Sequence, residues 1–287
     1  MSVRDLGYRA YEGERLPASR NTWVMLRHSL SRAWASWLVK IALFLSIGPL
    51  LVVGTLYAIN VFVFAPMAHV ETSAIDAGKL VRTLYGWETW IFVLMITIGA
   101  GAPAIAEDLT HKAFQYFFAK PVTIAQYLFG RIGATAIFAF TVTFLPAVLL
   151  VALTVLVGAP TSDLRLERMA LLLPALLDAV IIALVTSTVS VALSSLSKSR
   201  ALTMSAWVLL FLVPHVLAGL VSLLGHWDWL YLASLPGVLG ILGDALFKQT
   251  SADATVKWFH AAPVAVGLVV GALYLAYERL RRAEVIT

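Results

Sequence analysis

Six long apolar stretches run along the chain, separated by short polar segments. They cover approximately residues 39–64, 89–106, 124–157, 169–197, 201–224 and 261–278. A helix needs about 20 mostly apolar residues to cross the hydrocarbon core of a bilayer. The pattern therefore predicts an all-α, polytopic membrane protein with six transmembrane helices.

The segment 225–259 is the main ambiguity in this count. Its centre, residues 235–247, is moderately apolar and could be taken for a seventh span. It is short, however, and Pro236 and several glycines interrupt it. Trp227 and Trp229 are typical of the aromatic belt at a membrane surface. We therefore expect a large last external loop, 225–259, whose helices dip into the interface.

Residues 20–37 precede the first span and have the pattern of an amphipathic helix. Five large apolar residues fall within an arc of about 80° at 100° per residue. They are Trp23, Leu26, Leu30, Trp34 and Trp37. Such a helix lies in the plane of the headgroups. It either anchors the chain before the first span or also touches a cytoplasmic partner.

The composition supports a membrane location. Hydrophobic residues make up 60% of the 287 residues and charged residues only 13%, whereas soluble domains carry roughly 25% charged residues. The net charge of +5 does not indicate nucleic-acid binding, because the basic residues gather in loops and termini. The chain has no cysteine, so it has no disulfide or cysteine metal ligand.

The distribution of positive charge predicts the orientation. If the N-terminus is cytoplasmic, 15 of the 21 Lys and Arg residues lie on the inner side and 6 on the outer side. Positive residues favour the cytoplasmic side. We therefore expect a protein of the plasma membrane (the bacterial inner membrane) whose N-terminus and C-terminus both lie on the cytoplasmic side. The expected organisation is a cytoplasmic segment 1–38, a transmembrane domain 39–280 and a cytoplasmic tail 281–287.

Residues 107–131, between the second and third spans, hold the most informative pattern. Two carboxylates, Glu107 and Asp108, stand at the membrane edge. An aromatic stretch ended by a proline follows: Phe114, Tyr116, Phe117, Phe118 and Pro121. The spacing predicts a short helix with one aromatic face, which Pro121 ends because a proline restricts the residue before it. Such a helix could rest on lipid or transmit force from a partner.

This arrangement resembles the permease subunits of type-2 ABC exporters. Those subunits commonly show an acidic pair, a short apolar helix, a proline followed by a small hydroxyl residue, and a glycine before a basic residue. The matching positions are Glu107-Asp108, Phe114 to Phe118, Pro121-Val122-Thr123 and Gly130-Arg131. The N-terminal stretch 5–15 is also similar to one branch of these permeases.

The resemblance implies a partner and a role. It implies that segment 107–123 contains a coupling helix that docks into an ATP-binding cassette ATPase subunit. Its coupling residues would be Glu107, Asp108, Phe114, Tyr116, Phe117, Phe118 and Pro121. It also implies that a second permease subunit, identical or not, pairs with this chain. ATP and Mg would be bound by the ATPase and not by the permease. The substrates would be amphiphiles such as drugs, lipids or peptides, although ion extrusion or a role in metalloprotein maturation is also open.

The chain carries no recognisable enzymatic motif of its own. No GxxxxGK[ST] phosphate loop and no GxSxG nucleophile elbow occur in the sequence. The six histidines show no HExxH or paired ligand spacing. We therefore expect no catalytic residues, no metal site and no cofactor held by this chain.

Two polar residues in the apolar stretches are candidates for function. An intramembrane carboxylate is costly and therefore a functional candidate. Asp178 lies 19 residues, or about 28 Å, from the inner end of the fourth stretch, and His215 has a similar depth in the fifth. We expect them to pair or to line an outer cavity, unless Asp178 is a wet interfacial carboxylate with a structural hydrogen bond.

Small residues form two stripes that predict close helix packing. Ser187, Ser190 and Ser194 recur in the fourth stretch, and Gly267 and Gly271 form a GxxxG pattern in the sixth. Small residues let membrane helices approach closely. We expect both stripes to be internal packing surfaces rather than substrate contacts.

Two other classes of function remain open from the sequence. An ion-coupled secondary transporter would use membrane-buried ionisable residues and interrupted helices. A non-transporting membrane scaffold would only recruit cytoplasmic proteins. An ATPase encoded beside this chain that co-purifies with it would favour the exporter.

Overall fold

The computed structural model describes residues 20–68, 76–111, 122–225, 227–251 and 254–285, and these form helices with no strand among them. Six helical segments are long and apolar enough to cross a membrane. They are Trp37–Met67, Ala77–Thr110, Ile124–Gly158, Ser162–Ser194, Arg200–Gly225 and Trp258–Arg282. The prediction of an all-α protein with six candidate spans is confirmed at this level.

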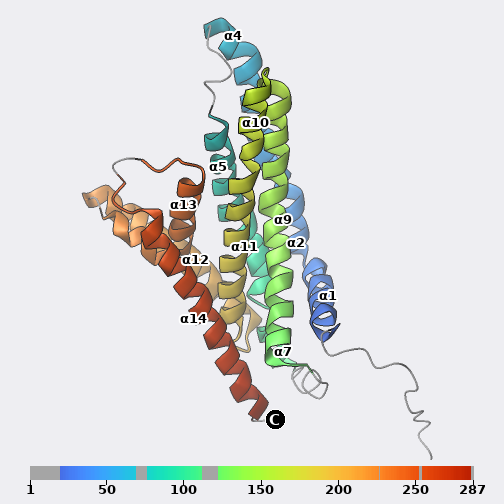
Figure 1. Cartoon of the computed structure of the whole chain (residues 1–287). Helices are drawn as coiled ribbons and strands as arrows, with labels where there is room; N and C mark the ends of the chain where they lie inside the picture. Colours follow the sequence, from blue (N-terminus) through green and yellow to red (C-terminus); the bar gives the residue numbers. More distant parts are fainter. Residues whose placement is uncertain (1–19, 69–75, 112–121, 226, 252–253, 286–287) are drawn as a thin grey trace, which may run out of the picture.

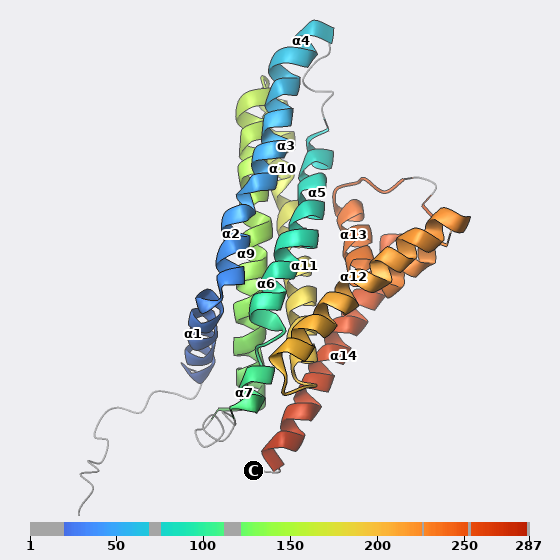
Figure 2. The ribbon, with the colours of Figure 1, turned by 180° about the vertical axis from the view of Figure 1, so that it is seen from behind.

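The N-terminal helix, α1 (Arg20–Ala35), packs against the third span. Its buried residues are Met25, Ser29 and Ala33. The tryptophans of its apolar arc are exposed, Trp23 to 60%, whereas Leu26 and Leu30 are half-buried. The sequence predicts a helix lying flat at the interface, whereas α1 runs beside the lower part of α9 (Ile124–Gly158) in both views (Figures 1 and 2). The extended backbone at Ser36 separates α1 from the first span.

The first span is nearly continuous. It consists of α2 (Trp37–Leu45), α3 (Ile47–Ile59), the π-helical turn η1 (Asn60–Phe64) and α4 (Ala65–Ala68). Many of its apolar side chains are exposed, as expected for a helix at the edge of the bundle in contact with lipid.

The second span is the most buried of the six. It comprises α5 (Ala77–Trp87), η3 (Glu88–Val93), α6 (Leu94–Ile96), η4 (Thr97–Gly101) and, after a turn, α7 (Ala106–Thr110); η3 and η4 are π-helical. The span begins at Ala77 and not at 89, because its first turns carry polar residues that the bundle accommodates. Arg82, for example, binds Asp244 at 2.7 Å.

The third and fourth spans form the centre of the bundle. Thr123 and Gln126 form a capping box that starts α9, and this satisfies backbone N–H groups at the helix end. The fourth span consists of α10 (Ser162–Ala170) and α11 (Leu172–Ser194). A methyl group at Gly101 would overlap Ser190, so small residues permit the second and fourth spans to touch.

The last two spans diverge from this centre. They are α12 (Arg200–Gly225) and α14 (Trp258–Val285), which slant away from α9 and α11 (Figure 2). The expected external loop contains η5 (Asp228–Ala233) and α13 (Leu235–Leu246). α13 is shorter than a span and buries one face against α11, α12 and α14. It is therefore part of the bundle and not an exposed loop helix.

The start of α1, the end of α14 and α7 all lie at one end of the bundle (Figure 1). The helix α14 continues through Val285, so most of the expected tail 281–287 is helical. α7 and the start of α9, which border residues 112–121 in the sequence, both lie at this end, and 112–121 themselves are outside the described residues.

Candidate functional site

Asp108 is the centre of a buried cluster at this end of the bundle. Its side chain is only 4% exposed. One carboxylate oxygen accepts a hydrogen bond from Tyr127 Oη at 2.5 Å and pairs with Arg131. The other oxygen pairs with Arg32 Nη1 at 2.5 Å. One carboxylate on α7 thus holds side chains from α1 and α9.

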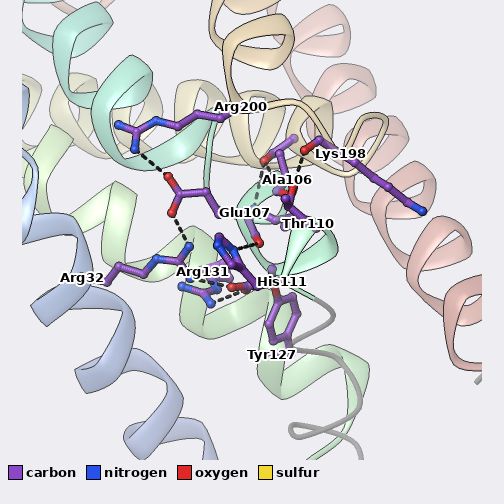
Figure 3. Close-up of polar contacts among 12 residues, drawn as sticks. Arg32, Ala106, Glu107, Thr110, His111, Tyr127, Arg131, Lys198 and Arg200 are labelled. Carbon is purple, nitrogen blue, oxygen red and sulfur yellow. Dashed lines mark hydrogen bonds and ion pairs between the residues drawn. The ribbon is translucent and has the colours of Figure 1, made fainter.

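Glu107 extends the cluster toward solvent. It pairs with Arg32 and, at 2.9 Å, with Arg200 at the start of α12 (Figure 3). Its side chain is 22% exposed and that of Arg200 is 54% exposed. Adjacent carboxylates therefore have different surroundings, because Asp108 points into the bundle and Glu107 lies at its rim.

Hydroxyl groups fix the two ends of α7. Ser194 Oγ, at the end of α11, accepts hydrogen bonds from the backbone N–H groups of Ile105 and Ala106, both at 2.9 Å. These are donors that a helix start leaves without an intrahelical partner. Thr110 donates to the backbone carbonyl of Lys198, between α11 and α12. The second span is thereby attached to the fourth and the fifth.

The electrostatics of the cluster favour a fixed geometry. Burial alone would lower the pKa of Arg32, but its hydrogen bonds and ion pairs with Glu107 and Asp108 raise the pKa overall. Burial of part of its ring, and then the charges of Arg131 and Arg32, lower the pKa of His28 on α1. The neutral form of His28 is therefore favoured beside these two cations.

A glycine allows α1 to reach the cluster. A Cβ atom at Gly130 would lie 2.9 Å from both the carbonyl carbon and the Cβ of Met25, which is closer than real Cβ contacts come. The absence of a side chain at Gly130 thus lets α1 approach α9 closely enough for Arg32 to reach Asp108.

The structure brings together only part of the predicted coupling set. Glu107 and Asp108 form the cluster. The other predicted coupling residues, Phe114, Tyr116, Phe117, Phe118 and Pro121, lie outside the described residues, as does the N-terminal stretch 5–15.

Asp178 and His215 do not form the expected pair. Asp178 is 1% exposed, and neither of its carboxylate oxygens has a hydrogen-bond partner. His215 Nδ1 instead lies 3.1 Å from Ser234 Oγ, and its ring packs edge-on against Trp90 and Tyr231. Asp178 faces the second span and α13, where a Cβ at Gly243 would lie 2.9 Å from Asp178 Oδ2.

The two small-residue stripes have different surroundings. Ser187, Ser190 and Ser194 are all fully buried. Gly267 and Gly271 face outward, with no atom within 4 Å of the position of an added Cβ. Among the described residues, the expectation of internal packing is therefore wrong for Gly267 and Gly271, because the side of α14 that carries them faces away from the bundle.

Sequence reasoning missed Glu88, which is fully buried with both carboxylate oxygens unpaired. It lies at the start of η3, one residue before the predicted beginning of the second span. Extending the helix back to Ala77 would have revealed it. Sequence reasoning also missed the roles of Arg32, Tyr127 and Arg200, whose only signal was a position near the ends of predicted helices.

The fold and the cluster define a helical protein with six candidate membrane spans, tied together at one end by a buried ion-pair network. Among the residues placed by the structure, no group of three or more His, Cys, Asp or Glu side chains could hold a metal ion. No known family model and no curated protein matches the sequence.

Proposed function

We propose that this chain is the membrane permease subunit of an ATP-driven exporter of the type-2 ABC class. In this proposal it sits in the plasma membrane with both ends cytoplasmic. It works with a second permease copy and with separate ATPase subunits that bind ATP and Mg.

The observation that carries the proposal is the position of the Asp108 cluster. The segment 112–121 is flanked by α7, which carries Glu107 and Asp108, and by α9, which carries Tyr127 and Arg131. A partner that moves this segment would move both flanks. Through Arg32 and Arg200 the displacement would also reach α1 and α12.

Such a connection suits a transporter whose energy source is another chain. Buried ion pairs hold a particular geometry, because breaking one leaves an uncompensated charge in a site of low dielectric constant. Rigid elements that move together can change access to a path between subunits. The cluster would thus convert closure of two ATPases into a movement of several spans.

Co-purification tests the docking of the partner. An ATP-binding cassette ATPase should be encoded beside this chain and should co-purify with it from a native membrane extract. Changing both Phe117 and Phe118 to aspartate should abolish co-purification while the permease remains inserted. The same two charges at Thr250 and Ser251, in the exposed loop after α13, should leave it intact. Retained binding of the Phe117→Asp/Phe118→Asp variant would refute the docking site.

A second candidate function, ion-coupled secondary transport, is favoured by Glu88 and Asp178. Both carboxylates are buried within candidate spans without a hydrogen-bond partner, and membrane-buried ionisable residues are typical of that class. Proteoliposomes containing this chain alone distinguish the two functions. Substrate or proton movement driven by a pH gradient, and lost in Glu88→Gln, would support the secondary transporter.

A further inference from the structure

A cavity of about 390 Å³ lies beside the Asp108 cluster, between α1, η4, the turn before α7 and α9. This volume is within the range of small-molecule sites, roughly 300–1,000 Å³. One part of its lining is charged and consists of Arg32, Glu107, Arg131 and Arg200. Another part is apolar and consists mainly of small alanines, including Ala33, Ala104 and Ala134.

Two buried polar atoms on residues that line the cavity have no hydrogen-bond partner. They are Oγ of Ser29 on α1 and Nε of Arg131 on α9. Each of these residues is only 3% exposed. A buried donor without a partner destabilises the folded state. Both atoms are closed off from the open part of the cavity, so a ligand with acceptor oxygens would satisfy them once these side chains turn toward it.

The charge balance favours an anion. Three guanidinium groups (Arg32, Arg131 and Arg200) face two carboxylates (Glu107 and Asp108), which leaves a net charge of 3 − 2 = +1. A monoanion would neutralise this excess. The planar fork of arginine matches the oxygens of a phosphate group, to which it donates paired hydrogen bonds.

The surroundings indicate that this phosphate belongs to a lipid. Trp37, the first residue of the first candidate span, lines the cavity and is 65% exposed. Trp34 is exposed nearby on α1. Tryptophan is enriched at the level of the lipid headgroups, and basic pockets between membrane helices bind such headgroups. The outward-facing apolar side chains of α2, such as Phe44, would contact the acyl chains.

We infer that this cavity binds the phosphodiester headgroup of a membrane phospholipid. Ser29, Arg131 and Arg32 would donate hydrogen bonds to its non-bridging oxygens. The lipid would fill the space between α1 and α9 and hold these helices together. This inference does not depend on ATP-driven transport, because the site lies within one chain.

A lipid titration of the purified full-length chain in detergent tests the binding. Phosphatidylglycerol should raise the apparent melting temperature in a saturable manner, as expected for a ligand that binds only the folded state. Inorganic phosphate at the same concentration and diacylglycerol should each have little effect. A full effect of inorganic phosphate would show that free phosphate is the ligand and would overturn the lipid assignment. An equal effect of diacylglycerol would show that the headgroup is not recognised.

Two variants locate the site. Ala134→Leu should fill the cavity without removing any charge and weaken binding at least tenfold. Ala136→Leu, on the same helix but outside the cavity, is the matched control and should bind normally. Ser29→Ala, a smaller change, should weaken binding several-fold even if Ala134→Leu folds poorly. Unchanged affinity in Ser29→Ala, or equal affinity in folded Ala134→Leu and the unmodified chain, would refute the site.

Discussion

Neutralising Asp108 should destabilise the bundle far more than neutralising its neighbour Glu107. In Asp108→Asn the shape of the side chain is kept, but the negative charge is lost. An amide group that itself donates hydrogen bonds then faces Tyr127, Arg131 and Arg32, all of which are donors. Arg131, only 3% exposed, is left without its carboxylate partner.

The expected magnitude follows from burial. Removing one partner of a buried ion pair costs about 3–5 kcal/mol, because the remaining charge is uncompensated. At roughly 2–4 °C per kcal/mol for chains of this size, the melting temperature should fall by roughly 6–20 °C. Glu107→Gln weakens two ion pairs, with Arg32 and Arg200, whose side chains are 31% and 54% exposed. Each of these partly exposed pairs should contribute only about 0.2–1 kcal/mol.

Thermal unfolding of the purified variants in detergent measures this difference. A further variant, Asp108→Asn combined with Arg131→Met, removes the orphaned charge and should recover part of the lost stability. The non-additive part reports the interaction between the two residues. If Asp108→Asn unfolds within about 2 °C of Glu107→Gln, the reasoning that burial makes Asp108 the centre of the cluster is wrong.

Three other perturbations have defined outcomes. Gly130→Ala should lower the free energy of unfolding by about 1–3 kcal/mol, because α1 must move away from α9. Gly267→Ala, where the added methyl group meets open space, should change the melting temperature little. Equal effects of the two substitutions would contradict this reasoning. Glu88→Gln and Asp178→Asn should fold with unchanged or higher stability, since neither carboxylate has a hydrogen bond to lose, and normal export by folded Asp178→Asn would remove its functional role. Because the pKa of His28 is lowered from 6.5 on folding, the unfolded state binds the proton more readily. Stability should therefore fall as the pH drops below about 6.5, and His28→Gln should weaken this dependence in melting curves between pH 5 and 7.5; an identical pH dependence would contradict it.

The long apolar stretches made the spans predictable, but not their polar ends. The third span was predicted at 124–157 and is found at Ile124–Gly158. The second was predicted from 89, yet it begins at Ala77. Hydropathy excludes its first turns because Arg82 and Glu88 are polar. The fold accommodates Arg82 by pairing it with Asp244, more than 150 residues away in the chain, and no local pattern reveals such a partner.

The candidate site could be predicted only as a location. The acidic pair Glu107-Asp108 is visible in the sequence, but its partners come from helices that are distant in the chain. Which of the two carboxylates is buried depends on the rotation of α7, which Ser194 helps to fix. Gly267 likewise faces outward because of the direction in which α14 leans. The GxxxG spacing in the sequence does not determine that direction.

The ion pair between Asp108 and Arg131 also closes a ring in the chain. The two residues are only 23 positions apart and flank the connection between the second and third spans. After a backbone cut within this ring, the ion pair between Asp108 and Arg131 would still hold the second and third spans together. Two polypeptides divided inside 112–121 and produced together should therefore reassemble into the same bundle.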